Sequence, residues 1–159
     1  MKENMVSIFL PRGRKNEENF VIVSVNGRSW KIMKGVQVQV PDYVAEVLEN
    51  SRMMAETARY IGQSGAEGVK LHLLHVLRNT DLAAEWQAGR VQTLELEEYI
   101  SILELCLRNL PPETVIHRLT GDGAKRDLLA PLWSGDKKRV LNAIHQTFLR
   151  DNLIQGSTL

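Results

Sequence analysis

Three polar residues close to one apolar segment form the strongest chemical grouping in the sequence: His117, Arg118 and Asp122. They combine an imidazole, a cation and a carboxylate around the turn Gly121-Asp122-Gly123. The planar guanidinium of Arg118 could bind a carboxylate or a phosphate, and Asp122 could accept a hydrogen bond from a ribose or an amine. The alternative is structural, because an Arg118–Asp122 ion pair would fix the turn without any ligand.

Two further histidines, His72 and His75, lie three residues apart in the apolar segment 68–77. Side chains alternate between the faces of a strand, so this spacing directs the two rings to opposite faces and rules out joint metal chelation. Parallel α/β folds gather their chemistry at the carboxyl ends of strands. His75 is therefore the candidate contact for a substrate or cofactor, and a hydrogen-bonded core histidine is the alternative.

The sequence contains one cysteine, Cys106. A single thiol cannot form an internal disulfide, a zinc cage or the ligand set of an iron–sulfur cluster. Its place between Leu105 and Leu107 in a helical pattern predicts core packing. No catalytic residue and no metal site are predicted. The cationic run 137–139 opens an amphipathic segment and favours a solvated helix face over an RNA contact.

Helices and strands alternate in the part of the chain that carries these residues. Apolar residues recur at helical spacing between Asp42 and about Gln63, and Thr93 is a candidate cap for a long helix that stops before Pro111. Shorter helices are predicted over 80–86, 126–133 and 137–152, buried strands over 68–77 and 115–120, and a frayed tail from Gly156. Such alternation is typical of a parallel α/β layer, and two strands cannot close a barrel.

The first 40 residues have a different pattern, with strands predicted over 6–10, 20–25, 29–33 and 36–40. Asn26-Gly27 is a typical two-residue hairpin turn, so these strands predict a small antiparallel sheet. The architecture therefore changes between residues 41 and 52, which predicts two units or a fusion.

Charge and hydropathy narrow the possible partners. The 20 basic and 19 acidic side chains create no strong field of one sign, so nucleic acid is not an expected partner. No apolar run approaches the roughly 20 residues that cross a bilayer, and the start Met1-Lys2-Glu3-Asn4 is not a secretory signal. We expect a soluble, cytoplasmic protein that does not contact a membrane.

Several blocks of the second part resemble the YhcC-type radical S-adenosylmethionine (SAM) proteins, in the family's order, over about residues 52–155. The most specific are Val115-Ile116-His117-Arg118-Leu119-Thr120-Gly121-Asp122-Gly123 and Leu129-Ala130-Pro131-Leu132-Trp133, joined by the blocks 54–61, 68–77 and 96–99. The resemblance implies a partial TIM barrel with a three-cysteine motif for a [4Fe-4S] cluster and with SAM at the carboxyl-end mouth. This chain would supply the last strands and C-terminal helices, and the cluster motif is missing from it.

The resemblance divides the chain into a β-rich segment, 1–51, and a radical SAM-like α/β part, 52–159. Residues 1–51 are similar to small structural proteins of tailed bacteriophages, through the blocks 25–32 and 40–51. Our leading hypothesis is a C-terminal portion of a radical SAM protein that is noncatalytic alone and holds no cofactor itself. The alternative is a phage-type structural or protein-interaction module. A protein partner or a homo-oligomer would cover the exposed barrel edges.

Overall fold

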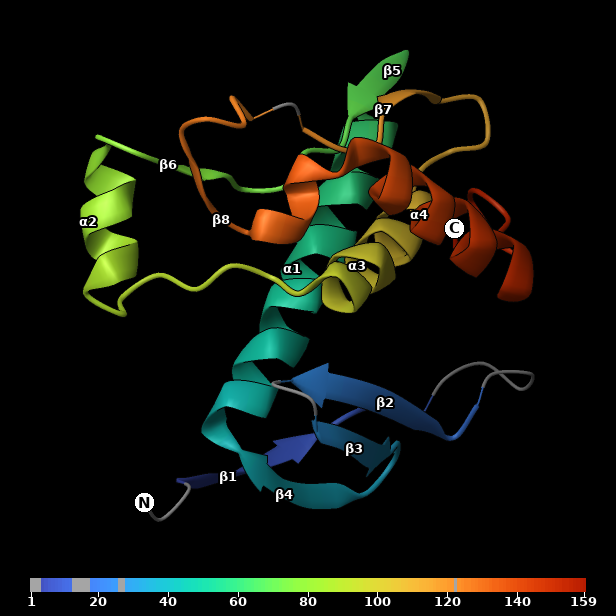
Figure 1. The fold of residues 1–159 in the computed structure, drawn as a ribbon. Helices are drawn as coiled ribbons and strands as arrows, with labels where there is room; N and C mark the ends of the chain where they lie inside the picture. The colour runs from blue at the N-terminus through green and yellow to red at the C-terminus, as the bar shows by residue number, and fades with distance from the viewer. Residues whose placement is uncertain (1–3, 13–17, 26–27, 122) are drawn as a thin grey trace. The chain divides into compact units, whose positions relative to one another are not determined.

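The computed structural model describes residues 4–12, 18–25, 28–121 and 123–159. The chain forms two compact units, Met1–Met53 and Met54–Leu159. The boundary between them falls within the long helix α1 (Asp42–Gln63), whose bounds agree with the predicted helix (Figure 1). The division into the domains 1–51 and 52–159 stays a prediction about the origin of the two parts.

The first unit contains two small antiparallel sheets. Strand β1 (Met5–Phe9) pairs with β4 (Gln37–Pro41), and β2 (Phe20–Val25) pairs with β3 (Arg28–Met33). Val25 lies opposite Arg28, while the predicted turn Asn26-Gly27 lies outside the described residues. The antiparallel character is therefore confirmed, but the strands are divided between two sheets.

The core of this unit draws one residue from each of four elements: Val23, Ile32, Val40 and Val44, all nearly fully buried. Strand alternation explains the choice, because Val23 and Ile32 lie on the face of β2–β3 that also carries Val21 and Trp30. These residues give the first unit a hydrophobic core of its own.

The second unit continues from α1 with short strands and three further α-helices. In chain order these are β5 (Gly68–Lys70), β6 (Val76–Leu77), α2 (Asp81–Gln87), α3 (Leu96–Arg108), β7 (Val115–Arg118), β8 (Leu128–Ala130), the 3₁₀ helix η1 (Leu132–Gly135) and α4 (Lys137–Arg150). β5 and β7 pair in parallel, and β6 and β8 pair antiparallel. The described strands thus form two-stranded sheets and no closed barrel, and none of the described helices is long and apolar enough to span a membrane.

Three predictions for this unit are wrong in detail. Segment 68–77 is two strands, because β6 leaves β5 and pairs with β8 instead. Residues 126–133 do not form a helix, since Pro131 has no amide hydrogen to continue one and the preceding residues pair with β6. Helix α3 is capped by Glu95 rather than by Thr93. The side chains of Glu95 and Glu98 form a reciprocal capping box.

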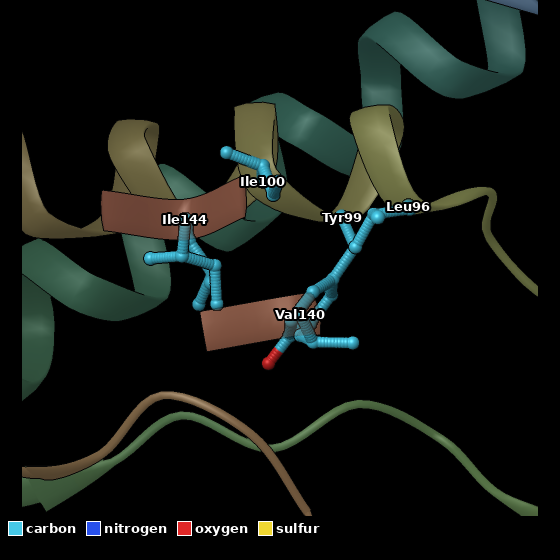
Figure 2. Packing of buried hydrophobic residues seen from close by; sticks show 6 residues of the cluster. Leu96, Tyr99, Ile100, Val140 and Ile144 are labelled. Carbon is cyan, nitrogen blue, oxygen red and sulfur yellow. The ribbon is translucent and has the colours of Figure 1, made fainter. Parts of the chain in front are cut away.

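The core of the second unit lies between the helices and one face of the β5–β7 pair. Val69 and Ile116, opposite each other in the two strands, pack with Ala58 of α1 and with Cys106 and Leu107 of α3. One face of α3 is an apolar stripe, in which Leu96, Ile100, Leu103 and Leu107 are all buried. Figure 2 shows residues of this stripe beside Val140 and Ile144 of α4.

The C-terminal tail, predicted to fray, is bound to the end of α3. The amide of Gly156 donates to the carbonyl of Leu107 at 3.1 Å, and the amide of Thr158 donates to the carbonyl of Arg108 at 3.0 Å. Helix ends leave carbonyls without partners, and the tail satisfies two of them. Its sequence shows no helical or strand period, so this docking could not be seen from the pattern.

A groove of about 440 Å³ lies between α3 and α4, and Glu104 is one of the charged residues that line it. The Oε1 atom of Glu104 is buried without a hydrogen-bond partner. Burial, followed by the repulsion of Asp151, raises the pKa of Glu104, while Arg150 lowers the pKa of Asp151 through a hydrogen bond. As the pH falls, Glu104 is therefore the first of the two carboxyl groups to take up a proton.

We expect the substitution Glu104→Gln to stabilise the protein at neutral pH. A carboxyl group whose pKa is raised by folding contributes stability below its unfolded pKa and loses it as the pH rises through the folded value. Because Glu104 is partly exposed, the gain should be roughly 0.5–1 kcal/mol at pH 8 and vanish near pH 4. Urea unfolding followed by helical circular dichroism measures it, with Glu97→Gln in the same groove as the control. A gain that is equal at both pH values would contradict this account.

Candidate functional site

The face of β5–β7 that points away from the helices carries polar and charged residues. Gly68 lies opposite Val115 and Lys70 opposite Arg118, while the pair Val69–Ile116 between them faces the core. Lys70 and Arg118 are exposed, and the side chain of Val115 is 54% exposed. Because partners across a ladder share a face, these two cations lie side by side on a surface that no described helix covers.

His117 joins the two cations through an irregularity in the strand register. Lys70 pairs with Arg118 rather than with His117, so His117 is the extra residue of a β-bulge. Its ring lies over Gly68, where an added Cβ would come within 2.5 Å of Nε2. A larger residue at position 68 would therefore displace the ring of His117, and the bulge places His117 and Arg118 together on the open face.

His75 lies apart from that face, beyond the carboxyl ends of the two strands. Its half-buried ring packs against the turn that follows β7: a Cβ on Gly121 would overlap Cε1 of the ring, and one on Gly123 would lie 3.0 Å from Cδ2. Both glycines of the turn thus leave room for one imidazole. The ring thus contacts the protein's own backbone, and a contact of His75 with a substrate or cofactor stays a prediction.

The predicted residues therefore divide into two groups. His117 and Arg118 share the open face, and His75 contacts the turn at the strand ends. Asp122 lies outside the described residues, so its proposed hydrogen bonds and its ion pair with Arg118 stay predictions. The sequence analysis missed Lys70, although a cation inside the apolar run 68–77 is a signal that could have identified it.

Tyr99 and Trp133 hold the strand ends on α3. The hydroxyl of Tyr99 donates to the carbonyl of Leu119 at 3.0 Å, and burial raises its pKa. The rings of Tyr99 and Trp133 lie 5.7 Å apart, and Nε1 of Trp133 donates to the carbonyl of Leu94 at 3.0 Å. The block 129–133, prominent in the resemblance, therefore has a structural role in this fold.

Cys106 does not fit the ligand set of an iron–sulfur cluster. It is the sequence's single cysteine, only 2% of it is exposed, and its Sγ lies 3.9 Å from the carbonyl of Met54. Burial raises its pKa to about 11, so the thiol is protonated at neutral pH. A cluster needs several thiolates. Within the described ranges, no group of three or more potential ligands is placed to hold a metal ion.

Comparison with known proteins identifies the family of the region that contains this face. Residues 66–150 match the family model of the Radical_SAM C-terminal domain, which is more than half of the chain. The chain belongs to the radical SAM C-terminal domain family. The match includes β5, β7 and all of α4, and so confirms the resemblance seen in the second part of the sequence.

Two curated proteins are similar to this chain, and one of them is the YhcC protein whose family the sequence blocks indicated. An uncharacterized protein, YtqA of Bacillus subtilis, is 35% identical over 109 residues, which cover 69% of this chain and 34% of YtqA. YhcC of Escherichia coli is 33% identical over 104 residues, which cover 65% of this chain and 33% of YhcC. The chain therefore spans about a third of the length of the curated relatives it matches.

We expect Gly121→Ala to lower the free energy of unfolding by about 1–3 kcal/mol, because its Cβ would overlap the His75 ring. The control is Gly135→Ala, whose Cβ would have its nearest neighbour at 3.7 Å. The double variant with His75→Ala should lose less than the sum of the single variants, since removal of the ring makes space for the methyl group. Urea unfolding of all four variants measures the coupling, and strictly additive losses would refute the contact.

Proposed function

We propose that the second unit is the C-terminal part of a YhcC-type radical SAM protein and that this chain is noncatalytic by itself. The observation that carries the proposal is the state of Cys106, a single buried thiol whose raised pKa keeps it protonated. Radical SAM chemistry depends on a cluster held by several cysteines, and no other cysteine exists in the sequence. We further propose a cytoplasmic location.

The geometry of β5 and β7 supports the proposal that these two strands belong to a partial TIM barrel. Each strand follows a helix, α1 or α3, and both helices pack on the same face of the pair. In a barrel, that face is the outer one, so the opposite face of β5–β7 would line the interior. We assign Lys70, His117 and Arg118 to this interior surface.

The chemistry of that surface suggests an anionic ligand. Lys70 and Arg118 are adjacent cations, and guanidinium groups bind carboxylates and phosphates with two parallel hydrogen bonds. The carboxylate of SAM or an anionic group of the substrate has the complementary charge. His75, near the strand ends, and Asp122, four positions after Arg118 in the sequence, complete the set of proposed contacts.

Anaerobic reconstitution with iron and sulfide tests the noncatalytic assignment. The purified chain should develop no iron–sulfur absorption and retain no stoichiometric iron, because the cysteine ligands are absent. Titration calorimetry should detect no SAM binding, because the proposed contacts of this chain alone do not complete a SAM site. Cys106→Ser should behave like the unsubstituted chain, and YhcC treated in the same way serves as the comparison. A stoichiometric cluster on the unsubstituted chain would show that the assignment is wrong.

A phage-type interaction module remains the alternative, and one observation favours it. Phe20, Ile22, Lys31 and Met33 share the outer face of β2–β3, where Ile22 is 62% exposed and Met33 44% exposed. Lys31 lies 3.9 Å from the centre of the Phe20 ring. An exposed apolar face of this kind is typical of an interaction site, here for further copies of the chain.

Under this alternative, the chain should self-associate through the first unit. Ile22→Ser should then weaken the association by about tenfold, because one buried aliphatic side chain is worth about 1.5–3 kcal/mol. Val36→Ser, at an exposed residue outside β2–β3, is the matched control. Sedimentation velocity over a concentration series measures the effect. A monomer at every concentration would exclude the alternative.

A further inference from the structure

The parallel pair β5–β7 is incomplete as a sheet. Parallel sheets are nearly always larger and covered on both faces, whereas this one has two strands and helices on one face. Each of its strands has one edge along which no other described strand lies. Edges of this kind are sites for pairing with another chain.

The order of elements identifies the edge along which a further parallel strand would lie. Helix α3 connects β5 to β7, and α1 precedes β5 on the same face of the pair, as the connecting helix of another parallel unit would. Consecutive parallel strands usually lie side by side, so a strand before α1 would lie along β5, on the edge away from β7. Here the strand before α1 is β4, which pairs antiparallel with β1 instead.

The backbone of β5 is arranged to accept such a strand. The carbonyl of Glu67 accepts from the amide of Val115, and the amide of Leu71 donates to the carbonyl of Arg118, each at 2.9 Å. Backbone groups of alternate residues point to opposite edges of a strand, so those of Gly68 and Lys70 point away from β7. A parallel neighbour would bind these two residues.

We propose that the free edge of β5 binds a parallel strand of the radical SAM portion of a YtqA- or YhcC-type protein. The inference rests on the proposed function and adds the partner and the contact. The relatives are three times longer than the segment matched here, and a C-terminal domain follows the remainder of its protein. A second copy of this chain fits less well, because two-fold symmetry would pair β5 with its copy antiparallel.

Co-expression under anaerobic conditions tests the proposal. The partner is tagged YtqA from which the matched segment of 109 residues has been deleted, and the bait is the full chain studied here. The full chain should be retained by the tagged fragment, and full-length YtqA, which contains its own matched segment, should not retain it. Failure of the fragment to retain the chain overturns the proposal.

Two variants at one position examine the edge itself. Lys70→Pro removes the outward amide hydrogen and should weaken retention by about tenfold, the effect of one hydrogen bond of about 1.4 kcal/mol. Lys70→Ala loses the same side chain but keeps that amide, so the tenfold loss is measured against Lys70→Ala. Proline is tolerated in edge strands, and circular dichroism checks that the variant is folded.

Hydrogen exchange provides a readout that needs no substitution. Binding should slow exchange of the amides of Gly68 and Lys70. Retention without this protection, or a dimer of the chain alone that protects them, overturns the assignment of the edge. If the chain alone assembles a cluster, the proposed function fails instead, and iron analysis of the unmixed chain separates the two results.

Discussion

The hydroxyl group of Tyr99 fixes the position of α3 on the ends of both parallel strands. It donates to the carbonyl of Leu119, after β7, and the carbonyl of Leu71, after β5, lies 3.5 Å from the same oxygen. Tyr99 is 4% exposed, so its hydroxyl cannot exchange these partners for water. The ring also packs against Trp133. The side chain of Tyr99 thus joins α3, the ends of β5 and β7, and η1.

The position of α3 determines which face of the β5–β7 pair is buried and which face is open. With α3 held against one face, Val69 and Ile116 are committed to the core. Strand alternation then sends Lys70 and Arg118 to the other face, and the β-bulge adds His117. The placement of the charged residues therefore follows from the packing of apolar ones, and changes in the core of the second unit should alter the site through the strand register.

The helices could be predicted from sequence because their signals are local. The stripe Leu96, Ile100, Leu103 and Leu107 repeats at helical spacing, and Thr80, directly before α2, caps that helix through its side chain. The exchange of partners within 68–77 could not be predicted, because pairing of β6 with β8 depends on residues about 50 positions away. The bulge at His117 could not be predicted either, because it depends on the register between two strands that are distant in the sequence.

The residues on the open face of β5 and β7 favour contact with a polar ligand over burial in an apolar core. A parallel strand buried on both faces is a continuous run of aliphatic residues, whereas the open face of these strands carries Lys70, His117 and Arg118. Solvent alone would satisfy Lys70, but it does not explain why Gly68 makes room for the ring of His117. A surface that combines two cations, an imidazole and a close backbone contact is better suited to an anionic ligand.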